Sequence, residues 1–492
     1  MTSARKNLFE RPSRTKIVAT LGPASNSNEM LQKLLFAGVD VFRINAAHGT
    51  QKDFELTVRN IRNASQKTGM PVAILMDLGG PKIRLGKLPN DELKLETDGT
   101  VAFISSKFQA KAETCPELAG IPCVTCSYEP LVNELRSGDR IVLADGSVEL
   151  RVSEVAGKKD QWAKCAILCG GKVRSRQGVN LPGVKLTIPA MLDADRSNAA
   201  WAAQNGIDFL GLSFVRNAME INDLKNLIAE NGGTSKVIAK IEKPEALDAL
   251  DEIILAADAV MVARGDLGVE TDIARMTILQ KEIIQICGQY RRPVIVATQM
   301  LESMTHHNLP TRAEVSDVAN AILDGADAVM LSGESAVGEF PEETVRMMHR
   351  IALNTEDAVN PDDFRFIPLL TPFNQVLEAL AQNVCDLAEQ LDAKFIVTVT
   401  ETGDSAMCLS ANRCPARILA FTSSDETLRK MCLDWGVVPF KFPKSIKSNQ
   451  SVMKFALDTL RSEELISSGD RIILFAEASD NSSQNAIVVY EC

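Results

Sequence analysis

The feature that most constrains this chain is a short, nearly continuous apolar segment that recurs eight times, at 16–22, 39–45, 73–78, 207–213, 237–242, 259–264, 294–300 and 328–333. Segments with helical periodicity lie between them, as at 28–36, 217–230, 276–287, 316–323 and 342–352. Apolar runs without alternation are typical of strands buried on both faces of a parallel sheet. Eight strand–helix units therefore predict an α/β fold with a closed (β/α)8 TIM barrel.

The repeat is interrupted once, after the third strand, where short alternating segments appear at 93–97, 101–105, 139–143, 147–152 and 161–168. This pattern predicts a small β-barrel domain that caps the barrel. Beyond the last repeat, a helix at 375–390 and strands at 395–400, 416–421, 471–474 and 486–490 predict an open α/β domain. We therefore expect an N-terminal arm and first part of the barrel at 1–84, the cap at 85–183, the rest of the barrel with the active site at 184–360, and a C-terminal regulatory or oligomerisation domain at 361–492.

Composition excludes several classes of protein. The 492 residues are 45% hydrophobic and 24% charged, which is ordinary for globular domains. A net charge of −11 argues against a nucleic-acid partner, and no apolar stretch is long enough to predict a membrane span. The basic arm at 5–14 lacks the apolar region of a secretory signal, and the eleven cysteines are scattered. We therefore expect a cytoplasmic protein without a disulfide framework.

Two cysteine pairs have spacings that zinc sites also use. Cys123 and Cys126 are three apart, and Cys165 and Cys169 are four apart. A zinc site built from them is conceivable from spacing. Buried thiols that simply pack in an apolar stretch are the favoured interpretation.

Polar residues gather at the C-terminal ends of the predicted strands, where barrel active sites are built. They are Arg43, Asn45, Asp77, Lys240, Glu242, Arg264, Asp266, Thr298, Ser332 and Glu334. Lys240 and Glu242 are two apart in a strand and so face the same side. With Asp266 from the next strand, the two carboxylates are suited to one hard divalent cation, with the ammonium beside it for an anionic substrate. A purely structural ion-pair cluster is the alternative.

No phosphate-binding loop of the G-x-x-x-x-G-K-[ST] type and no G-x-G-x-x-G is present, so a nucleotide would be held in another way. Longer segments carry a resemblance: TKIVATLGPAS at 15–25, GVNLPG at 178–183, IAKIEKPEAL at 238–247, MVARGDLG at 261–268, ATQMLESM at 297–304 and PTRAEVSDVANAILDGADAVMLSG at 310–333. In these segments the chain resembles the pyruvate kinase family along nearly all of the barrel. Beyond residue 360 it matches only in outline.

The resemblance implies glycolytic phosphoryl transfer from phosphoenolpyruvate to ADP, giving pyruvate and ATP. It implies that Glu242 and Asp266 bind Mg²⁺ or Mn²⁺, that Lys240 stabilises the transferring phosphoryl group, and that Arg43 holds the substrate phosphate. It also implies a substrate-binding role for Gly265 with Thr298, a proton route through Thr298 and Ser332, and a nucleotide site that includes Asn45, His48 and Arg84. A homotetramer is implied as well. Gln177 stands where the family often has Lys, with Arg176 beside it, which leaves the nucleotide contact at that position open.

Two departures concern a monovalent cation. The potassium-dependent branch of the family has Ser and Thr oxygens where this chain has Ala47 and Leu78, and it has Glu where this chain has Lys82. A fixed ammonium can replace a bound monovalent cation. We therefore expect the potassium-independent branch, with Lys82 as the substitute and no requirement for K⁺. A Lys82 side chain that points into solvent is the alternative.

The resemblance implies an effector site in the C-terminal domain, at a loop that enters a helix, and here that loop is 400–405. It carries Glu401 and Asp404, which are unsuited to a sugar bisphosphate. We expect no activation by fructose 1,6-bisphosphate. Two alternatives to the kinase stay open: another phosphoenolpyruvate-using barrel enzyme, and a non-catalytic scaffold of pyruvate kinase type.

Overall fold

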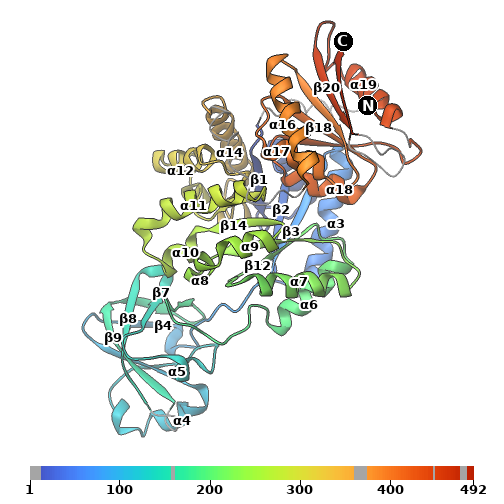
Figure 1. Ribbon diagram of the computed structural model, residues 1–492. Coiled ribbons are helices and arrows are strands. Elements are labelled where there is room, and N and C mark those ends of the chain that lie inside the picture. Colours follow the sequence, from blue (N-terminus) through green and yellow to red (C-terminus); the bar gives the residue numbers. More distant parts are fainter. Residues whose placement is uncertain (1–12, 157–160, 360–373, 447–448, 477–484) are drawn as a thin grey trace.

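The computed structural model describes residues 13–156, 161–359, 374–446, 449–476 and 485–492, so most of the predicted basic arm lies outside the described residues. Figure 1 shows three parts in a row: the inserted β domain at one end, the barrel in the middle and the C-terminal domain at the other end. Among the described residues, no helix is long and apolar enough to cross a membrane.

The predicted barrel is confirmed. Eight parallel strands close on themselves, and each corresponds to one predicted apolar segment. They are β1 (Lys16–Thr20), β2 (Val41–Asn45), β3 (Ala73–Asp77), β12 (Phe209–Leu212), β13 (Lys236–Ile241), β14 (Ala259–Ala263), β15 (Val294–Ala297) and β16 (Ala328–Leu331). These strands are almost entirely buried, because they have barrel interior on one side and helices on the other.

Helices surround the barrel and pack their apolar faces on it. They include α2 (Asn28–Ala37), α3 (Gln51–Thr68), α6 (Asp193–Gln204), α7 (Ala218–Glu230), α9 (Leu250–Ala256), α11 (Met276–Gln289), α12 (Arg312–Leu323) and α14 (Pro341–Glu356). Helix α12 starts four residues before the predicted start. The reason is a capping box, in which Thr311 accepts a hydrogen bond from the backbone N–H of Glu314 while the Glu314 side chain accepts one from the backbone N–H of Thr311.

The inserted domain is built on a six-stranded sheet that forms a half-barrel. Its strand order is β11 (Val179–Asn180), β7 (Arg140–Leu143), β8 (Val148–Val155), β9 (Trp162–Cys169), β5 (Thr100–Ile104) and β6 (Cys123–Val124). A second, two-stranded sheet pairs β4 (Glu92–Leu95) with β10 (Gly171–Arg174). The last strand, β11, leads the chain back toward the barrel.

The C-terminal domain is an α/β layer with strand order β19 (Val437–Lys441), β18 (Arg417–Thr422), β17 (Phe395–Val399), β20 (Arg471–Ala476) and β21 (Ala486–Glu491). The sequence analysis missed β19, which contains Pro439. Proline cannot donate to a strand ladder, so it reads as a break. It is tolerated here because β19 is an edge strand that pairs with β18.

This domain closes the N-terminal end of the barrel. Cys432 and Leu433 come from the C-terminal domain, yet they belong to the same buried cluster as the side chains that fill the barrel interior, such as Phe209 and Met261. A polar contact supports this position, because the side-chain Nζ of Lys16, at the start of β1, donates to the backbone carbonyl of Val437 at 2.7 Å. The two domains therefore share a core.

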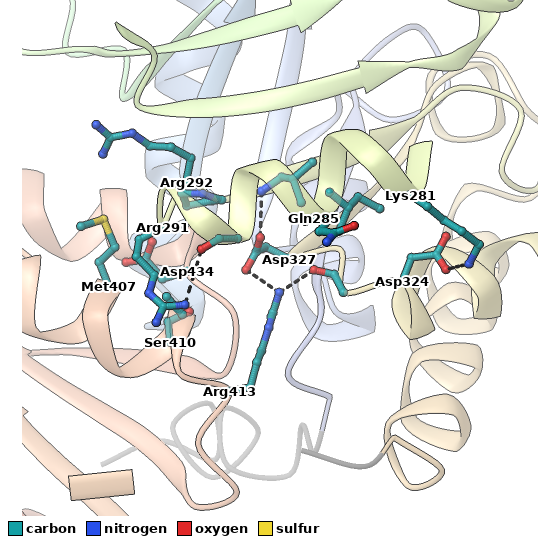
Figure 2. Close-up of a pocket in the computed structure, with 16 residues that line it drawn as sticks. Lys281, Gln285, Arg291, Arg292, Asp324, Asp327, Met407, Ser410, Arg413 and Asp434 are labelled. Carbon is teal, nitrogen blue, oxygen red and sulfur yellow. Dashed lines mark hydrogen bonds and ion pairs between the residues drawn. The ribbon is translucent and has the colours of Figure 1, made fainter. Parts of the chain in front are cut away.

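Figure 2 shows the polar side of this junction, a cavity of about 320 Å³ between α11 and α17 (Asp404–Ala411). Arg413 lies 3.1 Å from Asp327, and Asp327 accepts a hydrogen bond from the backbone N–H of Val294 at 2.8 Å. Asp434 also lines the cavity. Burial raises the pKa of Asp434 from 3.8 to about 7, because the loss of water around the carboxylate outweighs the opposing effects of Lys236 and Lys16. The charges of Asp327 and Asp404 add smaller increases.

This pKa makes a prediction about stability. The folded chain keeps the Asp434 proton up to pH of about 7, whereas the unfolded chain releases it near 3.8, so the folded state loses stability as the pH rises between these values. Asp434→Asn has no proton to release. Its stability relative to the parent should therefore grow by up to about 4 kcal/mol between pH 4 and pH 8, measured by urea unfolding. The exposed Asp223→Asn on α7 should show no such trend, and a flat difference for Asp434→Asn would contradict the assignment.

Candidate active site

The C-terminal end of the barrel interior holds a buried charge cluster centred on Asp77. Its Oδ2 accepts from Arg43 Nε at 2.8 Å and lies 3.3 Å from Lys240 Nζ. Arg43 Nη1 also donates to Thr20 Oγ1 at 3.0 Å. Burial by itself would raise the pKa of Asp77, but Arg43 and Lys240 together hold it below its ordinary value. The carboxylate thus sets two cations side by side.

Lys240 also reaches the next strand end. Its Nζ lies 2.9 Å from Glu242 Oε1 and donates to Ser213 Oγ at 2.8 Å. Burial would lower the pKa of Lys240, but Asp77 and Glu242 outweigh it and raise that pKa, so the ammonium stays charged. Glu242 Oε2 accepts from the backbone N–H of Phe214 at 2.7 Å. Each side chain is therefore fixed on two sides.

Asp266 comes from α10 (Arg264–Glu270), the short helix that follows β14. Burial raises the pKa of Glu242, and the Asp266 carboxylate raises it further, against the opposing effect of Lys240. Two carboxylates that disfavour each other's charge in this way suit a divalent cation, which would favour both charged forms. Asp266 Oδ1 lies 2.9 Å from Lys82 Nζ. Lys82 therefore contacts the site and does not point freely into solvent.

The turn after β15 is held in a strained conformation. Thr298 and Gln299 have φ values of 73° and 54°, in the left-handed region that β-branched residues rarely adopt. Thr298 Oγ1 accepts from the backbone N–H of Gly265 at 2.7 Å, and Arg264 Nη2 donates to the Thr298 carbonyl at 2.8 Å. The Thr298 hydroxyl is thus fixed beside α10.

Ser332 follows β16. Its backbone N–H donates to Glu334 Oε2 at 2.6 Å, while Glu334 Oε1 accepts from the backbone N–H of Leu301 at 3.1 Å. One buried carboxylate therefore links the turns after β15 and β16, which carry Thr298 and Ser332. Within the described part of the chain, no side-chain hydrogen bond joins Thr298 to Ser332, so a proton route between them stays a prediction.

Asn45 and His48 lie on the other side of the barrel mouth. Both line a cavity of about 510 Å³, together with Pro23, Asp53 and Phe54. Cavities of this size bind ligands as large as nucleotides.

Arg84 lies at the cap, where its backbone pairs with Gly178 and its Nη1 donates to the carbonyl of Arg176 at 3.2 Å. Gln177 accepts a hydrogen bond from the backbone N–H of Arg174 at 2.9 Å. The Gln177 side chain is therefore engaged in a local contact with the backbone of the cap.

Sequence reasoning missed several residues that shape this site: Thr20, Ser213 and Phe214. Ser213 and Thr20 are ordinary hydroxyl residues, and their partners come from distant strands, so no local signal marks them. Gly211 also belongs here, because a Cβ at that position would lie 2.1 Å from Asp77 Oδ1. As for zinc, no group of three or more His, Cys, Asp or Glu side chains that could hold a metal was found among the described residues.

Two family models match this chain. The model "Pyruvate kinase, barrel domain" covers residues 12–345, and "Pyruvate kinase, alpha/beta domain" covers residues 378–490. The chain is 41% identical over 470 residues to "Pyruvate kinase 2" of Synechocystis sp., a match that spans 94% of this chain and 76% of the relative. It is 38% identical over 465 residues to "Pyruvate kinase" of Geobacillus stearothermophilus, spanning 94% and 77%.

The architecture is also that of a solved relative. The crystal structure of a pyruvate kinase from Cryptosporidium parvum superposes with a TM-score of 0.89 at 33% identity, covering 100% of this chain and 99% of the other. A barrel with this charged site, a cap and a C-terminal α/β layer defines a phosphotransferase of the metabolic kinase class. The chain belongs to the pyruvate kinase family. The two alternatives, a scaffold and another barrel enzyme, are not favoured by these relatives.

The charge cluster makes a prediction about Asp77. Asp77→Asn removes the shared counterion of Arg43 and Lys240 and leaves both cations buried. Breaking a buried ion pair in this way costs about 3–5 kcal/mol of unfolding free energy. Urea unfolding should show a loss of this size. The exposed Asp223→Asn should change stability by less than about 0.5 kcal/mol, and an equally small effect for Asp77→Asn would contradict a central role for the cluster.

Proposed function

We propose that the side chains at the C-terminal end of the barrel transfer the phosphoryl group of phosphoenolpyruvate to ADP, each in the role that the family resemblance assigns to it. The observation that supports this most is the convergence of Arg43, Lys240, Glu242 and Asp266, from the ends of the three strands β2, β13 and β14, beside the cavity of about 510 Å³. Phosphoryl transfer requires charge neutralisation and alignment more than covalent chemistry, and this site supplies both.

Glu242 and Asp266 are the proposed ligands of Mg²⁺, with Mn²⁺ as the other candidate. Two carboxylates leave coordination positions for substrate oxygens, as is usual for this cation in phosphoryl-transfer sites. When bound, the divalent cation supplies positive charge that stabilises the oxygens of the reacting substrate. Phe214 and Lys240 hold the Glu242 carboxylate in place for this role.

Arg43 and Lys240 bind the substrate phosphate from two sides. Because Asp77 lies between them, neither has to be moved when the phosphoryl group arrives. Lys240 then acts on the group during transfer, when its charge is most spread. Gly265 and Thr298 bind the substrate end that becomes pyruvate. The Thr298 hydroxyl passes its proton to the methylene carbon and takes a proton from a water molecule in exchange. Ser332, on the turn that Glu334 links to the turn of Thr298, extends this proton route.

The nucleotide occupies the side of Asn45 and His48, and Arg84 approaches its phosphates from the cap. Both Asn45 and His48 line the larger cavity, and Arg84 lies on the segment that joins cap and barrel. Lys82 takes the place of a monovalent cation. Its ion pair with Asp266 and the absence of side-chain oxygens at Ala47 and Leu78 support this assignment.

We further propose the division into 1–84, 85–183, 184–360 and 361–492, a homotetramer, a cytoplasmic location and no activation by fructose 1,6-bisphosphate. The first is supported by the sheets, which fall into separate groups in these ranges. The others rest on family resemblance, on the cysteine pattern and on the acidic loop with Glu401 and Asp404. Light scattering tests the assembly, since a mass near the 53.5 kDa of one chain would exclude the tetramer.

A coupled assay tests the reaction. Phosphoenolpyruvate, ADP and Mg²⁺ should produce pyruvate, followed by NADH oxidation through lactate dehydrogenase. Lys240→Met should lower kcat by about two orders of magnitude, which corresponds to about 3 kcal/mol of transition-state stabilisation. Lys67→Met, on the outer helix α3, should leave kcat unchanged. Near-normal turnover by Lys240→Met would show that the role is wrongly assigned.

Potassium dependence tests Lys82. The parent should be fully active in tetramethylammonium buffer without K⁺, because the Lys82 ammonium already lies 2.9 Å from Asp266. Lys82→Glu places a carboxylate against Asp266, so its activity should fall severely without K⁺. Lys87→Glu, the same charge change at an exposed position five residues on, should have little effect. Activation of the parent by tenfold or more with KCl at constant ionic strength would refute this proposal.

A further inference from the structure

We propose that Asn180, Lys243 and Glu270 form a positioning latch that fixes the cap and both proposed metal ligands relative to one another. Lys243 Nζ donates to Glu270 Oε1 at 2.8 Å, and Asn180 Nδ2 donates to the same oxygen at 3.0 Å. The three residues come from three separate segments of the chain. None of them is among the residues proposed to touch substrate, nucleotide or metal.

The three residues of the cluster lie next to the proposed metal ligands and the cap in the sequence. Lys243 directly follows Glu242, and Glu270 is the last residue of α10, the helix that carries Asp266. The Lys243–Glu270 pair therefore joins the segments of the two proposed metal ligands. Asn180 ends β11, the last strand of the cap sheet. The hydrogen bond from Asn180 therefore connects the cap to the Glu270 carboxylate as well.

Because Glu270 is buried, its carboxylate depends on its hydrogen-bond donors for compensation of its charge. Asn180 is 7% exposed and Glu270 is 4% exposed, so the Glu270 charge is screened little by water. Glu270 Oε2 is buried and has no hydrogen-bond partner in the described structure. The whole compensation for this buried charge thus falls on Lys243 and Asn180. Loss of either donor leaves an under-compensated buried carboxylate, which would move to reach solvent or other donors.

Helix α10 contacts the cap side at its other end as well. Asp266, near the start of the helix, pairs with Lys82 on the segment that leads into the cap. Gly178, on the returning segment, lies against the same lysine, since a Cβ there would be 3.4 Å from Lys82 Cε. The helix is therefore held at both ends by the two segments that connect cap and barrel. A change in cap position is passed to Asp266 through these contacts.

The inference rests on the proposed role of Asp266 and Glu242 as metal ligands, and its test uses metal affinity measured without turnover. In the full-length protein, Asn180→Asp places a second carboxylate against Glu270. We expect it to weaken Mn²⁺ binding by fivefold or more, measured by electron paramagnetic resonance of free Mn²⁺. We also expect hydrogen exchange of the α10 amides at 264–270 to become at least tenfold faster.

The reciprocal variant separates positioning from a general loss of structure. Glu270→Gln alone should also weaken Mn²⁺ binding, but the double variant Asn180→Asp, Glu270→Gln again pairs one amide with one carboxylate. It should return the Mn²⁺ affinity to within twofold of the parent. Tyr128→Phe serves as the matched control, because it removes a hydrogen bond between Tyr128 and Thr187 that does not involve α10. It should leave both measurements unchanged.

Two outcomes would overturn the latch. In one, Asn180→Asp changes exchange only around residue 180 and leaves Mn²⁺ affinity intact, which would make the cluster a plain structural anchor. In the other, the double variant binds Mn²⁺ no better than the single variants. Asp266→Asn distinguishes failure of the proposed function: if it does not weaken Mn²⁺ binding, the ligand assignment itself is wrong. If it does and Asn180→Asp does not, only the latch is wrong.

Discussion

The carboxylate of Asp77 is the interaction on which the rest of the site depends. It lies inside the barrel, where an unpaired charge would be expensive, and it is matched there by Arg43 and Lys240. Without it, the two cations would repel each other at the place where an anionic substrate has to bind. Lys240 in turn pairs with Glu242. The ion pairs therefore connect side chains of β2, β3 and the end of β13. The protein's own side chains therefore hold one another in place, and phosphoryl-transfer chemistry depends on such preorganisation.

A second constraint concerns α10, which follows β14 and connects the end of that barrel strand to the cap. Its first residues carry Gly265 and Asp266, and its last residue is the buried Glu270. The strained turn at Thr298 docks on the start of the same helix. The proposed contacts to substrate and metal and the contact to the cap therefore converge on the seven residues of α10. A small displacement of this helix would be felt at all three, since packed elements of this kind shift as units.

The opposite end of the barrel is governed by packing. Leu433 and Cys432 extend the interior core of the barrel into the C-terminal domain, and Arg413 and Asp327 supply the polar part of that contact. Because β16 begins just after Asp327 and ends just before Ser332, the junction lies at one end of a strand whose other end borders the site. The C-terminal domain is thereby continuous with the scaffold that carries the active residues.

The sequence by itself determined the barrel, the place of the insertion and most of the charged site. Eight apolar segments without alternation can be buried only as a covered parallel sheet, and charges at their C-terminal ends must then meet. The sequence analysis missed the edge strand β19, because a proline such as Pro439 argues locally against a strand. Tertiary structure alone decided which partner each charge takes: that Lys82 reaches Asp266, that Ser213 receives Lys240, and that Asn180 and Lys243 share Glu270. These contacts join residues up to 184 positions apart. Local periodicity carries no information about such pairs, because they exist only once the barrel has closed and the cap has been placed on it.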